Sequence, residues 1–398
     1  MTVRSLLYIA VGLLGTIAFS IAAIFFYPVN SLLYDPTAGA VFDRSGRAED
    51  VLAENALAEI LPSPVAVTHI STPSEVKAIY MTSFVAGDRE WRERLVNLIE
   101  ETELNSVVID IKDYTGLIAF KISDSALQGI ASVDERISDI RRFIGDLHER
   151  GIYVIGRIAA FQDPALALKR PDLSVKKATD KNIIWKDYKG QSWVDPGSEE
   201  VWAYMANVGK TAYEVGFDEL NYDYIRFPSD GNMNDIYYPF SEGKIRTQVI
   251  GDFLSYLNTE LSSISAALSA DLFGMTTTNA NDLNIGQQLE MALLYFDYVA
   301  PMVYPSHYPP NFNEYKNPAE KPYEVVKYSM DKAVARASTT AGKLRPWLQD
   351  FSIGSVTYTP EMVKAQIQAV YDSGLNSWML WNASNRYTNE ALLKETDI

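Results

Sequence analysis

The chain has 398 residues, 47% of them hydrophobic, and carries a formal charge of −16 from 35 Lys and Arg against 51 Asp and Glu. An acidic chain disfavours nucleic acid and anionic lipid as its main partner, because phosphate binding requires a basic patch. There is no cysteine, and the three histidines form no H-E-x-x-H pair, which excludes disulfides and a cysteine nucleophile and disfavours a zinc hydrolase.

The N-terminal segment 5–26, SLLYIAVGLLGTIAFSIAAIFF, contains no charged residue. A helix of about 20 apolar residues is long enough to cross a bilayer. Arg4 precedes the segment and the next basic residue is Arg44, so the positive-inside rule places residues 1–4 in the cytoplasm and the rest outside. We therefore expect a single-pass signal anchor in the cell membrane. Secretion after signal cleavage is the alternative, although a signal peptide usually has a shorter apolar run of about 7–15 residues.

Residues 27–74 contain scattered proline, glycine and acidic residues without a sustained period, which predicts an extracytoplasmic stalk. From 75 to 398, apolar strand-like segments alternate with amphipathic helical patterns. The eight predicted strands are 76–83, 106–113, 152–161, 218–227, 264–273, 298–305, 344–351 and 376–383.

Two helices between these strands have clear boundaries. In 133–151, four aliphatic residues share one face and Gly151 marks the end, whereas in 359–374 Thr359 is a candidate N-cap before Pro360. Eight alternating units predict a (β/α)8 barrel. A doubly wound open sheet is the alternative, but no G-x-G-x-x-G follows the first strand.

Polar residues gather at the carboxyl ends of the predicted strands, where a barrel of this kind carries its active site. In the fourth strand Glu219, Asn221 and Asp223 share one face and Leu220 and Tyr222 the other. Because helices cover the outside of a barrel, the carboxylates should point into the lumen. The other polar candidates are Asp110, Lys112, Arg157, Arg226, Asp271, Tyr304, His307, Gln349, Asp350, Trp381 and Asn382.

Each candidate also has a structural interpretation. Lys112 and Asp110 could form an ion pair, Arg226 could cap its strand or bind a carboxylate, and Trp347 is interpreted as a packing residue. A divalent metal held by Asp110, Asp113 and Asp223 is a further possibility. The favoured interpretation includes neither a metal nor a cofactor.

Nine motifs in order resemble a family of glycoside hydrolases once described only as a domain of unknown function. They are VVIDIKDYTGLI, GIYVIGRIAAFQDPALA, WVDPGSEEVW, GFDELNYDYIRFPSDG, SADLFG, IGQQLE, PMVYPSHY, RPWLQDF and MLWNASN, and they span residues 74–390. The family is similar to the (β/α)8 barrels of the α-amylase and α-galactosidase groups. The resemblance implies a polysaccharide or oligosaccharide substrate, and the predicted anchor places that substrate outside the cytoplasm.

The resemblance also implies roles for three carboxylates. Asp223 corresponds to the nucleophile at the end of the fourth strand, Asp271 to the acid/base where the α-amylase pattern usually has Glu, and Asp350 to a third carboxylate that stabilises the transition state. Neighbouring strands lie about 4.8 Å apart, close to the carboxyl separation of roughly 5 Å found in retaining enzymes, so we predict retention. The rival class is a non-catalytic barrel that, tethered to the membrane, binds cell-wall glycan or another exported protein as a scaffold. It predicts that Asp223 and Asp271 do not face each other across an open cleft.

Overall fold

The computed structural model describes residues 66–397. The predicted anchor, 5–26, and the predicted stalk up to residue 65 lie outside the described residues. Among the helices within 66–397, none combines the length and the apolar character that crossing a bilayer requires. The predictions of an anchor and of an extracytoplasmic domain therefore stay predictions.

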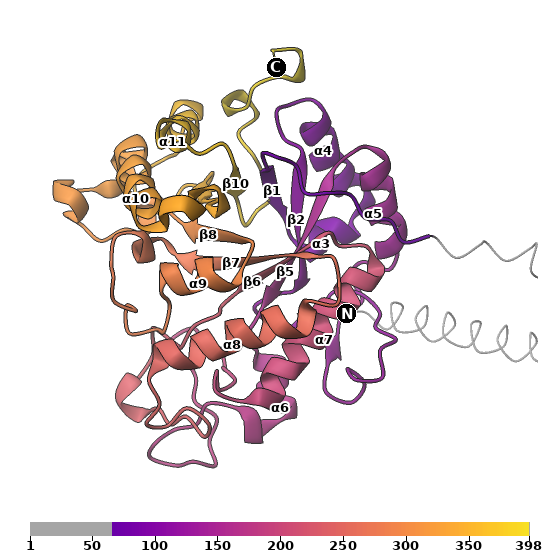
Figure 1. The fold of residues 1–398 in the computed structure, drawn as a ribbon, viewed down its shortest axis with the longest axis vertical. Helices are drawn as coiled ribbons and strands as arrows, with labels where there is room; N and C mark the ends of the chain where they lie inside the picture. Colours follow the sequence, from indigo (N-terminus) through magenta and orange to yellow (C-terminus); the bar gives the residue numbers. More distant parts are fainter. Residues whose placement is uncertain (1–65, 398) are drawn as a thin grey trace, which may run out of the picture. The chain divides into compact units, whose positions relative to one another are not determined.

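Eight parallel strands form a closed ring (Figure 1). They are β1 (Lys77–Met81), β2 (Ser106–Lys112), β5 (Tyr153–Ala159), β6 (Glu219–Asp223), β7 (Ala267–Phe273), β8 (Tyr298–Met302), β9 (Trp347–Gln349) and β10 (Trp378–Trp381). Closure is direct, because β1 pairs in parallel with both β2 and β10. All eight predicted strands are confirmed, and the open-sheet alternative is wrong.

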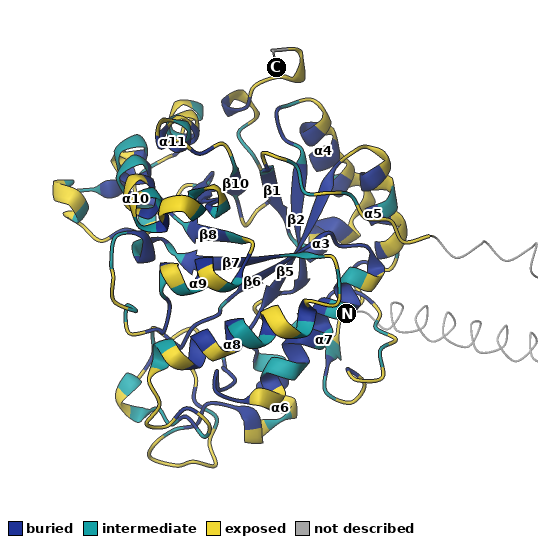
Figure 2. Cartoon of the chain, in the orientation of Figure 1, coloured by how far each residue is buried: buried dark blue, intermediate teal, exposed yellow. Residues whose placement is uncertain are grey.

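Helices surround the ring and bury one face each against it (Figures 1 and 2). They are α3 (Ser83–Gly87), α4 (Arg89–Glu100), α5 (Ile140–Glu149), α6 (Pro164–Lys169), α7 (Glu199–Val215), α8 (Arg246–Leu261), α9 (Leu289–Tyr295), α10 (Pro322–Ala337) and α11 (Pro360–Asp372). The α11 boundaries were predicted correctly: the Thr359 side chain accepts a hydrogen bond from the Met362 amide, and Gly374 follows the helix with φ +79°. Helix α5 begins later than its pattern suggested, since Ser132–Val133 form a short strand instead.

That short strand, β4, belongs to an extension that the sequence did not predict. Strand β3 (Leu117–Ile118) pairs antiparallel with the end of β2, and β4 pairs with β3. The register between β2 and β5 shifts between Asp110 and Lys112. A shift of this kind turns the side chains beyond it away from the direction that simple alternation predicts.

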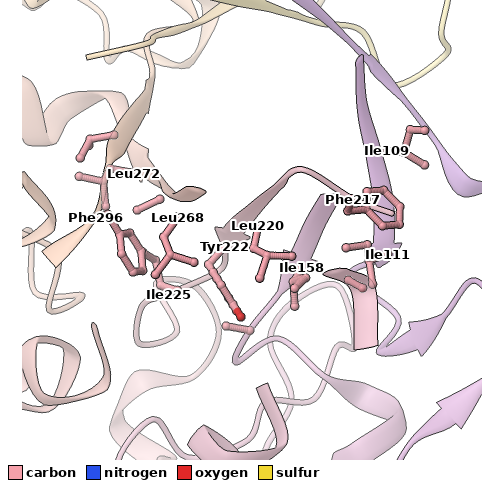
Figure 3. Close-up of a cluster of buried hydrophobic side chains, with 14 of the residues drawn as sticks. Ile109, Ile111, Ile158, Phe217, Leu220, Tyr222, Ile225, Leu268, Leu272 and Phe296 are labelled. Atoms are coloured by element: carbon pink, nitrogen blue, oxygen red, sulfur yellow. The ribbon is translucent and has the colours of Figure 1, made fainter. Parts of the chain in front are cut away.

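The alternation predicted for the fourth strand is confirmed. Leu220 and Tyr222 point outward into the apolar layer between the strands and the helices, which Figure 3 shows together with Phe217 and Phe296. Glu219 points into the lumen, where its carboxylate lies 2.9 Å from Nη1 of Arg345. A buried ion pair therefore fills the lower lumen and leaves the upper end of the ring for the remaining polar side chains.

The final residues of the predicted stalk pack against the base of the barrel. The Ile70 amide donates to Asp218 at 2.9 Å, and the Ile70 side chain packs against the lumen cluster. The Thr72 hydroxyl lies 2.9 Å from the hydroxyl of Tyr153 in β5. The amino-terminal end of the ring is thus covered, so the opening of the barrel is at its carboxyl end.

Candidate active site

A cavity of about 430 Å³ lies at the carboxyl ends of the strands. This volume is within the range of about 300–1,000 Å³ that is usual for small-molecule sites. Its charged lining residues are Arg157, Lys189, Asp223, Arg226 and Asp271. Its ring-bearing lining residues are Tyr224, Phe273, Tyr304, His307, Tyr308, Trp347 and Trp381, and Gly274, Met275 and Met302 complete the wall.

The guanidinium of Arg157, on β5, lies at the centre of the charged groups. Its Nη1 donates to Asp110 at 2.8 Å, its Nη2 forms an ion pair with Asp223, and its Nε lies 3.7 Å from Oδ2 of Asp271. Strands β5, β6 and β7 are consecutive neighbours in the ring, which is why residues far apart in sequence meet here. The two carboxylates expected to carry the chemistry therefore face one cavity from adjacent strands.

Asp271, on β7, has two carboxylate oxygens in different environments. Its Oδ1 accepts hydrogen bonds from Nδ2 of Asn221 at 2.9 Å and from Nε1 of Trp347 at 2.7 Å. Its Oδ2 makes no hydrogen bond to any described residue. Burial, and next the charge of Asp223, raise the pKa of Asp271 to about 8. The arrangement therefore favours a protonated Asp271 at neutral pH, with Oδ2 as the oxygen that can hold the proton.

Asp223, at the end of β6, is paired with a cation and placed in a strained turn. Apart from the Arg157 ion pair, its Oδ1 accepts a hydrogen bond from the Tyr224 amide at 2.5 Å. Tyr224 itself has φ +53°, a left-handed conformation that is uncommon for a bulky residue. Such strain tends to occur at functional sites, where the surrounding structure maintains it. Here it turns the chain sharply after the carboxylate, so that both residues line the cavity.

Asp110 accepts a hydrogen bond from Arg157 but does not line the cavity. Its Oδ2 accepts a hydrogen bond from the Tyr80 hydroxyl at 2.5 Å, and burial raises its pKa. The ring of Tyr80 stacks on Trp381 with centroids 4.0 Å apart, and Trp347 meets Trp381 edge-on at 5.4 Å. Tyr80 therefore connects the aromatic wall to the charged cluster, because its ring stacks on Trp381 and its hydroxyl donates to Asp110. Flat aromatic faces of this kind suit the apolar faces of sugar rings.

Of the residues predicted from sequence, the structure brings seven into the lining of the cavity: Arg157, Asp223, Arg226, Asp271, Tyr304, His307 and Trp381. Asn221 lies one layer deeper and orients Asp271. Gln349 bonds both the amide and the hydroxyl of Ser306, and so holds the loop that carries Tyr304 and His307.

Three further predicted residues lie outside the cavity. The predicted pair of Lys112 with Asp110 is wrong, because the shifted register turns Lys112 to Asp163, 2.8 Å away and fully buried. Both carboxylate oxygens of Asp350 bond to Thr388, at 2.6 and 2.8 Å, which does not support a role on the transition state. Asn382 donates to the Asp350 carbonyl in the loop after β9 and to the Arg386 carbonyl of its own loop.

The metal alternative also lacks support. Asp110 and Asp223 are paired with Arg157, while Asp113 is paired with Arg136 at 2.5 Å. Within residues 66–397, no group of three histidine or acidic side chains is arranged to hold a metal ion.

Sequence reasoning missed several lining residues. Trp347, interpreted as a packing residue, also donates its indole N–H to Asp271. Lys189 lies in the long connection between β5 and α7, where no strand period places a side chain. The available signal was composition alone: a cation beside an aromatic residue, Tyr188, in a segment that follows a strand at the open end of the barrel.

Residues 78–387 match the model of the family described as "Putative glycosyl hydrolase domain". No curated protein matches the chain. Among solved structures, a hypothetical protein from Ruminiclostridium thermocellum ATCC 27405 is 33% identical over 48% of this chain and 96% of that one, with a TM-score of 0.44.

Two more distant structures cover most of the barrel. The glycoside hydrolase domain of PgaB (BpsB) from Bordetella bronchiseptica is 14% identical over 80% of this chain and 98% of that one, with a TM-score of 0.57. The C-terminal domain of a "putative chitinase" from Desulfitobacterium hafniense DCB-2 is 13% identical over 80% and 97%, with a TM-score of 0.50. At these identities the likeness concerns the fold.

Proposed function

Because the chain belongs to the family described as "Putative glycosyl hydrolase domain", we propose that it hydrolyses glycosidic bonds in a polysaccharide or oligosaccharide. Asp223 is the nucleophile and Asp271 the acid and base. The observation that carries the proposal is the contrast between two carboxylates at one cavity: Asp223 is paired with Arg157, whereas the pKa of buried Asp271 is raised to about 8. Glycoside hydrolysis requires one carboxylate and one carboxylic acid.

The reaction proceeds in two steps with retention of configuration. In the first, the Oδ2–H bond of Asp271 breaks and the proton passes to the glycosidic oxygen, while an oxygen of Asp223 bonds to the anomeric carbon and the leaving sugar departs as an alcohol. In the second, Asp271 takes a proton from water, and the water oxygen displaces Asp223 from the anomeric carbon. Nε of Arg157 is buried without a hydrogen bond, 3.7 Å from Oδ2 of Asp271, and can stabilise the carboxylate formed between the steps.

The aromatic wall places the sugar. Trp347 and Trp381 line the cavity and meet edge-on, and Tyr304 lies against His307 with centroids 5.3 Å apart. These rings supply apolar surface for sugar faces, and Tyr304 and His307 add polar atoms for hydroxyls.

The pH profile tests the assignment of Asp271. Since the protonated form donates the proton and its pKa is about 8, kcat/KM should fall as pH rises through that value, by about tenfold per pH unit on the alkaline side. The Asp271→Asn variant cannot lose this proton, so its residual activity should lack the alkaline decline. An alkaline limb of the same shape in both proteins would assign the decline to another group.

We further propose that the domain acts outside the cytoplasm, tethered by the apolar segment 5–26, with secretion after cleavage as the alternative. Protease added to intact cells that express the full chain should degrade the domain in the membrane fraction. Recovery of the domain from the medium would favour secretion, and full protection inside the cell would contradict both.

A glycan screen tests the proposed function. The full chain, purified in mild detergent, is incubated with an array of bacterial surface polysaccharides, and new reducing ends are measured beside the double variant Asp223→Asn, Asp271→Asn. We expect release by the wild type alone, and NMR of the first product should show the anomeric configuration of the substrate bond. Binding without release would favour the non-catalytic module, and an inverted product would contradict the nucleophile.

A further inference from the structure

One wall of the cavity carries two cations that form no ion pair with a carboxylate of residues 66–397. The whole chain has a net charge of −16, yet three cations and two acidic residues line the cavity. Of the three cations, Arg157 is occupied by Asp110 and Asp223. Arg226 and Lys189 remain, and neither has an acidic oxygen within 4.0 Å among residues 66–397. In a chain this acidic, two unpaired cations at the one proposed substrate site require an explanation.

Arg226 is held rigidly with part of its guanidinium unused. The residue is only 8% exposed, and its guanidinium carbon lies 4.7 Å from the ring centroid of Phe273 and 4.8 Å from that of Trp193. Its Nη1 donates to the Phe227 carbonyl and to the Ser229 hydroxyl, both at 3.1 Å. Neither Nε nor Nη2 donates to any described residue. Burying a cation without a partner is unfavourable, so this fixed, unpaired edge indicates a group that arrives with the ligand.

Nearby carboxylates do not fill this role. Asp223, Asp230 and Asp187, in that order of strength, influence Arg226 only from beyond ion-pair distance, and Asp223 is itself paired with Arg157. Asp187 is occupied by the backbone amides of Lys189 and Gln191, at 2.9 and 2.8 Å. That turn fixes the backbone of Lys189, whose side chain is exposed at the cavity and makes no ion pair with a described residue. Its charge reaches the cavity, since Lys189, after burial, contributes to lowering the pKa of His307.

We propose that the cavity binds a sugar that carries a carboxylate, as in a uronic acid residue, with Arg226 and Lys189 as the anion site. This deepens the proposed function and rests on it. A guanidinium edge presents two parallel N–H groups that match the two oxygens of a carboxylate, and Lys189 adds a mobile point charge. The anion site shares the cavity with Asp223 and Asp271, so the charged sugar occupies the cleavage site or the position next to it.

Direct binding tests the anion site without requiring turnover. Methyl glucuronide and methyl galacturonide are titrated against the full chain by ligand-observed NMR beside methyl glucoside and methyl galactoside, which carry a neutral hydroxymethyl group in place of the carboxylate. Because hydrogen bonds between charged groups are about twice as strong as neutral ones, we expect at least one uronide to bind about tenfold or more tightly than its neutral counterpart. Arg226→Met should remove this preference, and Lys189→Gln should reduce it. The control is Lys186→Gln, an exposed lysine on the same loop outside the cavity.

The outcomes separate this inference from the proposed function. Equal binding of charged and neutral sugars, or a preference that survives Arg226→Met, overturns the anion site even if the glycan screen detects hydrolysis. A preference that Arg226→Met removes supports the site even if no glycan is cleaved. Glucose 6-phosphate is the remaining test ligand. If it binds through Arg226 and neither uronide binds, the carboxylate assignment is overturned in favour of a phosphorylated glycan. Retained secondary structure in each variant, measured by circular dichroism, ensures that lost binding reflects the site.

Discussion

Replacing Asp223 with Asn should lower kcat by a factor of about 10⁴ to 10⁶ on the glycan that the screen identifies, the range seen when a hydrolase loses a member of its nucleophilic unit. The amide has nearly the shape of the carboxylate but cannot bond to the anomeric carbon. It still occupies the turn before Tyr224, so the fold should persist. Single-turnover and steady-state rates measure the loss, and the melting temperature reports any change in stability.

Asp110→Asn is the matched control for this variant. Asp110 pairs with the same guanidinium as Asp223 but does not line the cavity. Asp110→Asn also removes one negative charge beside Arg157 but leaves the nucleophile in place, so kcat of this variant should fall far less. Adding azide to Asp223→Ala should restore turnover, because a small anion can occupy the space of the missing carboxylate and attack in its place. Comparable losses in the two Asn variants, or no rescue, would show that Asp223 acts only through Arg157.

The barrel of strands and the pair Asp223 and Asp271 could be predicted, because both follow from regular patterns of apolar and polar residues in the sequence. Each strand of a (β/α)8 barrel is buried on two faces, so the apolar segments stand out, and alternation alone assigns Asp223 to the lumen beside Asn221. Strand order then brings β6 next to β7 and Asp223 next to Asp271. No side-chain detail was needed for either inference.

The missed features arise where the period breaks or a loop intervenes. The register shift in β2 turns Lys112 to Asp163, which alternation cannot anticipate. Asp350 follows β9 by one residue, and the chain beyond β10 returns to bond it through Thr388. Lys189 reaches the cavity through the turn on Asp187. Positions fixed by long-range loop contacts leave no periodic signal in the sequence, whereas positions on strands do.

The common feature of the site is that one buried cation compensates several buried acids. Arg157 contacts Asp110 and Asp223 directly and lies 3.7 Å from Asp271, all three of them nearly inaccessible to solvent. The pKa of Asp110 and the pKa of Asp271 are already raised by burial. The stability of the fold and the reactivity of the site therefore depend on the same guanidinium.

Arg157→Met should lower the free energy of unfolding by about 3–5 kcal/mol, the usual loss when one partner of a buried ion pair is removed. Methionine fills much of the volume, so the loss comes from the acids left uncompensated and not from a cavity. Urea unfolding at neutral pH measures it. The deficit should shrink as pH falls, because the variant raises the folded-state pKa values of Asp110 and Asp271 further above their unfolded values, and protonated carboxyls no longer need a cation. Adding Asp110→Asn should recover part of the loss, which a double-mutant cycle quantifies. The control is Arg170→Met, which removes a surface ion pair with Asp172 and Glu200 and should lower stability by no more than about 1 kcal/mol. A similar small loss at Arg157, independent of pH, would mean that solvent and not Arg157 compensates the three acids.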